Sequence, residues 1–185
     1  DRPMRFVPHA YQADAIRFLL TTPRAALFLD MGLGKTPITL SAIRTLIATG
    51  EVQRVLVIAP KRVAEHTWTD EAQKWSHTSG LTFVRILGSA AQRRAALATP
   101  GHVFLINREN AKWLVEQCGR AWPFDMVVID ESSSFKDQGA QRFKALRKVC
   151  RKATRMVLLT GTPTPNSYLE LWPQFYLLDQ GDRLG

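Results

Sequence analysis

The chain has 185 residues, of which 45% are hydrophobic and 22% are charged. This composition is typical of one globular domain and excludes a low-complexity chain, and no apolar run approaches the roughly 20 residues that cross a bilayer. The formal net charge of +9 favours a polyanionic partner such as nucleic acid. Cys118 and Cys150 lack the spacing of a zinc site or a disulfide framework, which indicates ordinary thiols in a reducing compartment.

Short apolar segments alternate with segments of helical periodicity along the chain. The predicted strands are 25–29, 54–59, 82–86, 102–106, 125–129 and 155–160. Helices are predicted at 36–49, 61–75, 89–98, 108–118 and 139–150, with outer helices at 9–20 and 166–178. This alternation predicts an α/β fold, in which a mostly parallel sheet carries helices on both faces. Ligands of such sheets bind beyond the carboxyl ends of the strands.

A glycine-rich turn separates the first predicted strand from its helix. It reads Asp30-Met31-Gly32-Leu33-Gly34-Lys35-Thr36. Backbone N–H groups, the Lys35 ammonium and the Thr36 hydroxyl at one helix start suit a triphosphate and its Mg²⁺ ion. The first glycine of a full phosphate-binding loop (P-loop) is replaced by Leu29. The strand before and the helix after still favour a phosphate-binding turn over an ordinary helix start.

A pair of acidic residues, Asp130 and Glu131, follows the apolar run 126–129 about a hundred residues later. That run is typical of a buried strand that carries carboxylates at its carboxyl end. Lys35 would then hold phosphate, Thr36 and Asp130 would hold the metal ion, and Glu131 would activate a water molecule. In this order and spacing the residues predict a nucleotide hydrolase.

The densest basic run lies further along the chain. It comprises Arg142, Lys144, Arg147, Lys148, Arg151, Lys152 and Arg155. Apolar residues recur between them at helical spacing, which predicts an amphipathic helix over 142–155 with a basic outer face. Both a nucleic-acid contact and an ordinary solvated surface are compatible with this face.

A third motif ends the last predicted strand and reads Leu158-Leu159-Thr160-Gly161-Thr162-Pro163-Thr164-Pro165-Asn166. Together with the glycine-rich turn and the acidic pair, it resembles the first RecA-like lobe of superfamily-two helicases. The following Leu169-Glu170-Leu171-Trp172 makes the chain similar, more narrowly, to the Swi/Snf-type DNA translocases. The resemblance covers nearly the whole chain, from Val7 to Leu178.

Smaller matches extend the resemblance. Tyr11-Gln12 stands where the family reads adenine with a glutamine, and Ile58-Ala59-Pro60-Lys61, followed by Trp68, Glu71 and Trp75, resembles motif Ia. Leu105-Ile106-Asn107-Arg108-Glu109 resembles motif Ib. The resemblance implies that Gln12 reads adenine and that DNA phosphates contact Pro60, Lys61, Arg62, Asn107 and Arg108. Trp68 and Trp75 lie seven residues apart on one helical face, which predicts core packing.

Two features depart from the family. Ser132-Ser133 replaces the alanine and histidine that commonly follow the acidic pair, although Ser133 can still donate a hydrogen bond. We expect Ser133, Thr160, Gly161 and Thr162 to couple the nucleotide to the nucleic acid. Nothing after the third motif resembles the motifs of the second lobe, which supplies an arginine finger. We therefore expect residues 1–185 to form lobe one and to be nearly inactive as an ATPase alone.

The resemblance implies an ATP-binding motor lobe that couples hydrolysis to movement on double-stranded DNA. Its cofactors would be ATP and Mg²⁺, and its partners double-stranded DNA and the second RecA-like lobe, with no membrane. The motor lobe of a restriction or nuclease complex is one alternative, and a nucleotide- or DNA-binding module without turnover is another. Glu131 argues against the latter, because a pure binder needs no water-activating carboxylate. We expect a cytoplasmic location in a bacterial or viral setting.

Overall fold

The computed structural model describes residues 2–29, 34–131, 140–161 and 176–179, with side chains at all of these except 131, 140–143 and 176–179. The strands are β1 (Arg24–Phe28), β2 (Val55–Ala59), β3 (Phe83–Ile86), β4 (Val103–Asn107), β5 (Met126–Glu131), β6 (Arg155–Thr160) and β7 (Tyr176–Asp179). The α-helices are α1 (Ala10–Thr21), α2 (Lys35–Ala48), α3 (Trp68–Lys74), α4 (Ala90–Leu97), α5 (Ala111–Cys118) and α6 (Ala140–Lys152). A π-helix, η1 (Val63–Thr67), and a 3₁₀ turn, η2 (Arg108–Asn110), complete the described elements.

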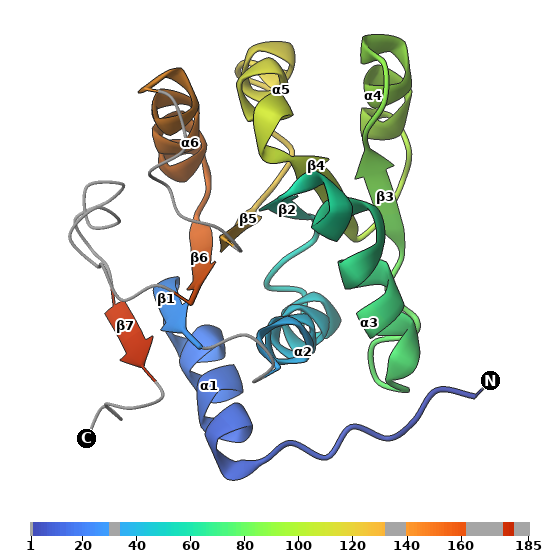
Figure 1. Ribbon diagram of the computed structural model, residues 1–185, viewed down its shortest axis with the longest axis vertical. Coiled ribbons are helices and arrows are strands. Elements are labelled where there is room, and N and C mark those ends of the chain that lie inside the picture. Colours follow the sequence, from blue (N-terminus) through green and yellow to red (C-terminus); the bar gives the residue numbers. More distant parts are fainter. Residues whose placement is uncertain (1, 30–33, 132–139, 162–175, 180–185) are drawn as a thin grey trace.

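The strands form one parallel sheet in the order β3-β4-β2-β5-β6-β1-β7 (Figure 1). All six predicted strands are confirmed. Most residues of each are apolar, and β2 and β4 are buried along their whole length because helices cover both faces of the sheet. Within the described residues, no helix is long and apolar enough to cross a bilayer.

A hydrophobic cluster lies between each face of the sheet and the helices that cover it. On one face, apolar residues of α1, α2, η1 and α3 pack against alternate strand residues such as Leu27, Val57 and Val128. On the other face, α5 and α6, with the end of α4, pack against the intervening residues such as Ile58 and Ile129. Figure 1 shows the same division, with α1, α2 and α3 on one side of the sheet and α4, α5 and α6 on the other.

The predicted outer helix 166–178 is wrong at its end. Residues 166–175 lie outside the described residues, but 176–178 belong to β7, which pairs with β1 from Ala25↔Tyr176 to Phe28↔Asp179. Tyr176, Leu177 and Leu178 form a short apolar run that fits a buried strand as well as a helix. Pairing with β1 decides between them, because β1 would otherwise expose an unpaired edge.

The predicted helix 61–75 is confirmed except at its last residue. Residues 61–74 are helical without a break, with the π-helix η1 before α3, and Trp75 is extended, with a backbone bridge to Met4. A π-helix adds one residue to a turn and so changes which side chains face the sheet after it. Here the first residue after it, Trp68, is fully buried.

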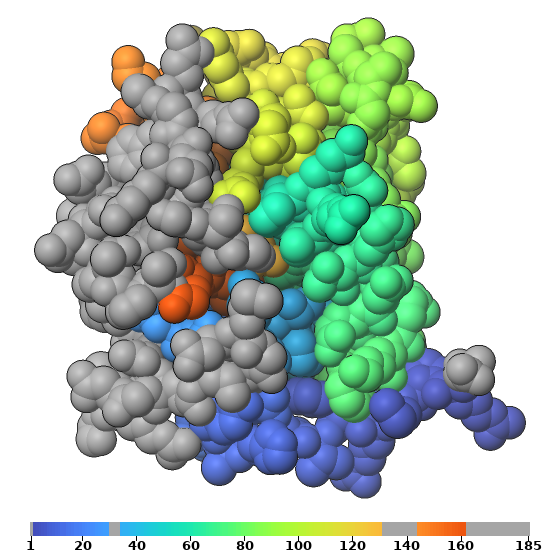
Figure 2. Space-filling view, in the orientation of Figure 1, coloured from blue at the N-terminus to red at the C-terminus, as the bar shows by residue number. Residues whose placement is uncertain are grey.

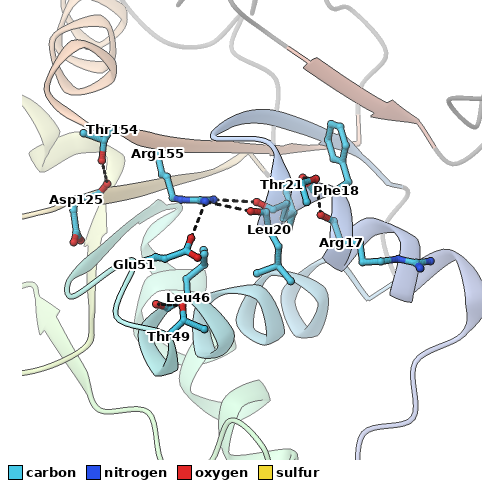
Figure 3. A network of polar contacts seen from close by, with 11 residues as sticks. Arg17, Phe18, Leu20, Thr21, Leu46, Thr49, Glu51, Asp125, Thr154 and Arg155 are labelled. Atoms are coloured by element: carbon cyan, nitrogen blue, oxygen red, sulfur yellow. Dashed lines mark hydrogen bonds and ion pairs between the residues drawn. The ribbon is translucent and has the colours of Figure 1, made fainter.

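The predicted basic helix 142–155 is wrong at its carboxyl end, because α6 ends at Lys152 and Arg155 is the first residue of β6. The Arg155 guanidinium donates to the carbonyl oxygens of Leu19 and Leu20, each at 3.2 Å, and forms an ion pair with Glu51 at 3.2 Å (Figure 3). The last carbonyls of a helix lack intrahelical donors, and Arg155 supplies donors to those of α1. Arg155 therefore joins β6 to α1 instead of lying on a basic outer face.

Arg155→Ala should lower the free energy of unfolding by about 1–3 kcal/mol, because two helix-end carbonyls lose their donors. Arg151 is exposed on α6 and provides the control. Arg151→Ala should change stability by about 0.5 kcal/mol or less. Urea unfolding followed by circular dichroism measures both, and equal losses would contradict the role of Arg155.

Candidate functional site

The carboxyl ends of the strands bring the sequence motifs to one edge of the sheet. Asp130 and Glu131 end β5, and Thr160, at the end of β6, pairs with both Glu131 and Phe28. On the other side of β5, Ala59 of β2 pairs with Asn107 of β4. This register collects segments more than a hundred residues apart in sequence, such as Phe28 and Thr160, at the edge where ligands of parallel sheets bind.

The Asp130 carboxylate is the centre of the site. It is only 1% exposed. Its Oδ1 accepts a hydrogen bond from Lys35 Nζ at 3.1 Å, and its Oδ2 accepts one from Trp68 Nε1 at 3.0 Å. Lys35 is the first residue of α2 and Trp68 the first of α3, so two helices meet on one strand end.

The burial of Asp130 explains why its carboxylate needs these hydrogen-bond partners. An ionised carboxylate removed from water costs several kcal/mol unless an opposite charge and hydrogen bonds replace the solvent. The Lys35 side chain, 16% exposed, supplies that charge. The pair therefore holds a positive group and a negative group side by side at the start of α2.

The turn before α2 requires a glycine at position 34. Gly34 is the N-cap of α2 and has φ 83°, in the left-handed region that glycine favours. A Cβ there would lie 2.5 Å from Gln12 Nε2, so a side chain would also displace the Gln12 amide. Pro37 is tolerated because the first turn of a helix has unpaired N–H groups. Thr36, the other predicted ligand, is buried in the same turn.

Gln12 is brought to this turn although it lies on α1. Its side chain is 7% exposed, and its Oε1 accepts a hydrogen bond from the backbone N–H of His9 at 2.9 Å. The neighbouring Tyr11 ring stacks on His9, with ring centroids 6.0 Å apart. The amide therefore lies against Gly34, where the predicted adenine and phosphate sites would adjoin.

The third motif meets the exit of β1. The N–H of Leu29 donates to the carbonyl of Thr160 at 3.2 Å, and the Thr160 side chain is fully buried. A Cβ on Gly161 would be in ordinary van der Waals contact, at 3.5 Å, with the carbonyl oxygen of Leu29, the residue after β1. The segment leading into the glycine-rich turn and the start of the third motif are thus in direct contact.

The predicted nucleic-acid residues differ in exposure. Lys61 is 73% exposed and Arg62 is also exposed, whereas Pro60 is half-buried and accepts the N–H of Ala64 through its carbonyl. Asn107 is buried, and its amide contacts Glu109 and Asn110. Arg108 is half-buried in η2. Figure 2 shows η1 and α3, teal to green, on the outer surface below α4.

Several predicted residues lie outside the described residues: Met31, Gly32, Leu33, Ser133 and Thr162. The backbone of Glu131 is described at the end of β5, opposite Thr160, but its side chain is not. The site is thus described at Gln12, Gly34, Lys35, Thr36, Asp130 and the start of the third motif.

Sequence reasoning missed the polar role of Trp68. Its prediction as a core residue is confirmed, since the side chain is 0% exposed, but its indole N–H also binds Asp130. Trp75, half-buried, instead donates to Glu71 at 3.1 Å. The order of the strands, with β2 beside β5, is what brings the helix after β2 to Asp130. Periodicity carries no signal for that neighbourhood.

The two cysteines form no part of this site. Both are free, and burial raises the pKa of the Cys150 thiol to about 12. Burial also raises the pKa of Cys118. Thiols with raised pKa values are poor nucleophiles at neutral pH, which agrees with one buried and one half-buried ordinary cysteine.

The sequence matches a known protein family and is similar to several known proteins. Residues 11–182 match the SNF2-related domain. The putative protein p41 of Acyrthosiphon pisum secondary endosymbiont phage 1 is 44% identical over 187 residues, covering 97% of this chain and 41% of that protein. The DNA excision repair protein ERCC-6-like of Mus musculus is 31% identical over 166 residues, covering 84% of this chain and 13% of that protein.

Solved structures share the fold. The Sulfolobus solfataricus SWI2/SNF2 ATPase core in complex with dsDNA has a TM-score of 0.72 at 22% identity, covering 93% of this chain and 36% of that one. The UvsW helicase from bacteriophage T4 has a TM-score of 0.69 at 16% identity, covering 95% and 61%. The chain spans less than two thirds of the length of each of these proteins. It belongs to the SNF2-related domain family and has the RecA-like fold of a helicase-type ATPase core.

Proposed function

We propose that this chain is the ATP-binding motor lobe of a DNA-dependent ATPase that moves along double-stranded DNA. The observation that carries the proposal is the Lys35–Asp130 contact of 3.1 Å between the start of α2 and the end of β5. Phosphoryl transfer needs a cation for the phosphates and a carboxylate for the metal ion at one point. Membership of the SNF2-related family supports the same assignment.

The described residues fit ATP and Mg²⁺. Lys35 would hold phosphate at the start of a helix, where the first N–H groups favour anions. Thr36 and Asp130 offer the hydroxyl and carboxylate oxygens that Mg²⁺ prefers. The Lys35 ammonium compensates the negative charge of Asp130 in this structure. Mg²⁺ would compensate that charge when Lys35 holds phosphate. Bound Mg²⁺ would neutralise charge that develops on the phosphate oxygens, and Glu131 would activate the attacking water.

Gln12 would select the base. An amide offers both a donor and an acceptor, which is the pair that the edge of adenine presents. Its contact with the Gly34 turn supports this role, because the base and the phosphates belong to one nucleotide and their two sites must adjoin.

DNA would bind through its phosphates at the carboxyl edge of β2 and β4. Lys61 and Arg62 supply exposed cations there, and the net charge of +9 favours such a partner. The dsDNA complex of the related Sulfolobus ATPase core supports double-stranded DNA as the substrate. Thr160 and Gly161 contact the exit of β1, a position from which the third motif would couple nucleotide and DNA together with Ser133 and Thr162.

Residues 1–185 would form the first of two lobes. A second lobe would supply an arginine finger, which is worth about 10³–10⁵ in rate in comparable enzymes. ATP binding would close the lobes and hydrolysis would reopen them, so that alternating grip moves the protein along DNA. The isolated chain would bind ATP weakly and turn it over at close to background rates.

Lys35→Ala should weaken ATP binding about 10- to 100-fold, the value of one or two charged hydrogen bonds. Glu131→Gln should leave binding intact and lower turnover about 10²- to 10⁴-fold in the two-lobed protein, because only water activation is lost. Calorimetric titration and a steady-state ATPase assay measure the two effects. Lys61→Ala, which removes a charge at the same sheet edge, is the control for binding. Wild-type turnover by Glu131→Gln would refute the role of Glu131.

Gln12→Ala should reduce the preference for ATP over GTP, since one base-reading amide is lost. Gln92→Ala is a matched control, because Gln92 accepts the N–H of Ser89 at the start of α4 just as Gln12 accepts that of His9. Competition between the two nucleotides for the wild-type protein and both variants gives the ratio of affinities. An unchanged ratio in Gln12→Ala would exclude adenine recognition by this residue.

DNA affinity should be independent of sequence and fall steeply with salt, because phosphates make the contacts. Lys61→Ala and Arg62→Ala should each reduce the slope of log affinity against log salt by about 0.9. Arg54→Ala, an exposed residue just before the opposite end of β2, is the control and should leave the slope unchanged. Salt titrations with two unrelated duplexes test this, and selective, salt-insensitive binding would contradict it.

A further inference from the structure

The indole of Trp68 combines complete burial with a polar contact. The side chain is 0% exposed and packs in the cluster formed by α1, α2, η1 and α3. Its Nε1 lies 3.0 Å from Asp130 Oδ2. Packing alone does not require that N–H, since an aromatic ring without a polar atom would contribute apolar surface equally well.

The two donors reach Asp130 from different elements and take different oxygens. Lys35 of α2 donates to Oδ1 and Trp68 of α3 donates to Oδ2. An indole can only donate, and its position is fixed by the surrounding core, whereas the lysine ammonium ends a flexible chain. A hydrogen bond from a rigid donor to a buried, charged acceptor is among the stronger and more directional ones.

We propose that Trp68 is a positioning residue of the metal site. Its N–H fixes the rotation of the Asp130 carboxylate by holding Oδ2, while Oδ1 accepts from Lys35, and so orients the carboxylate that would hold Mg²⁺. The inference rests on the proposed function, because it takes Asp130 as a metal ligand. It adds a residue whose contribution acts through that ligand and not through nucleotide.

The proposal predicts different effects on the affinity for Mg²⁺ and on the affinity for nucleotide without metal. Groups that hydrogen-bond a metal-binding side chain typically contribute about 10- to 100-fold to metal affinity, because they orient the ligand. The residues proposed to hold phosphate and base are Lys35 and Gln12, and the indole N–H binds neither of them but Asp130. Loss of the N–H should therefore weaken Mg²⁺ binding to the nucleotide complex and leave metal-free nucleotide binding unchanged.

Trp68→Phe removes the N–H while keeping an aromatic side chain, and Trp75→Phe is its matched control. Trp75 follows the same helix, and its N–H binds Glu71 instead of Asp130. Binding of a fluorescent ATP analogue is measured in EDTA and then as a function of Mg²⁺ concentration. In Trp68→Phe the Mg²⁺ concentration at half-saturation should rise about 10- to 100-fold, with affinity in EDTA unchanged. In Trp75→Phe neither value should change.

An equal Mg²⁺ requirement in Trp68→Phe and the wild type would overturn the proposal, as would a parallel loss of affinity with and without Mg²⁺. A wild-type protein that binds no nucleotide would overturn the proposed function and the inference with it. A wild-type protein that binds nucleotide with a normal Mg²⁺ response, together with an unaffected Trp68→Phe, would refute the inference alone.

A second variant distinguishes loss of the N–H from loss of folding. Benzothienylalanine at position 68 keeps the bicyclic ring and replaces the N–H with sulfur, so the core volume is retained. Thermal unfolding establishes that each variant is folded. The same rise in Mg²⁺ requirement is expected for this analogue, and wild-type behaviour of the folded analogue would overturn the role of the N–H.

Discussion

The buried charge of Asp130 is the constraint on which the site depends. A carboxylate that is 1% exposed must have its solvent replaced by protein donors, and those donors must come from neighbouring elements. β5 lies between β2 and β6 in the sheet, so the helix that follows β2 passes beside its carboxyl end. Lys35 and Trp68 meet Asp130 there, and both helices are fixed relative to β5 by the same group.

At the amino ends of the strands, opposite the site, hydrogen bonds within the protein join the helices to the sheet. Arg155 donates to the carbonyls that end α1, and Arg24 donates to the carbonyls of Cys150 and Ala153 near the end of α6. Asp125 accepts the backbone N–H groups before β2, and the Thr154 hydroxyl donates to its carbonyl (Figure 3). These contacts join the helix layers to the sheet at its amino edge, which leaves the carboxyl edge for ligands.

The sheet was predictable because mostly apolar strand segments alternate with segments of helical periodicity, a pattern typical of a parallel sheet covered by helices. That Lys35 and Asp130 lie at the same edge of the sheet followed from the two motifs and from the rule that ligand sites lie at carboxyl ends, whereas their direct contact is a finding of the structure. The strand at 176–179 did not follow, because a short apolar run obtains its structure from the neighbouring β1. The assignment of Arg155 to the basic helix face, alongside its assignment to the strand 155–160, was wrong for a similar reason, because its partners in the structure are 104–136 residues away in sequence.

The segment from Pro60 to Lys74 joins the two activities of the proposed motor. It begins with the exposed cations Lys61 and Arg62, continues through η1, and reaches Trp68 and Asp130 within one short run of helical turns. Coupling between sites is carried most simply by a rigid element that contacts both. A shift of this segment would either draw the Trp68 N–H away from Asp130 or carry the carboxylate with it. In the proposed motor, therefore, DNA contact and metal-ligand orientation are linked by one element, and no chain of intermediate contacts is required.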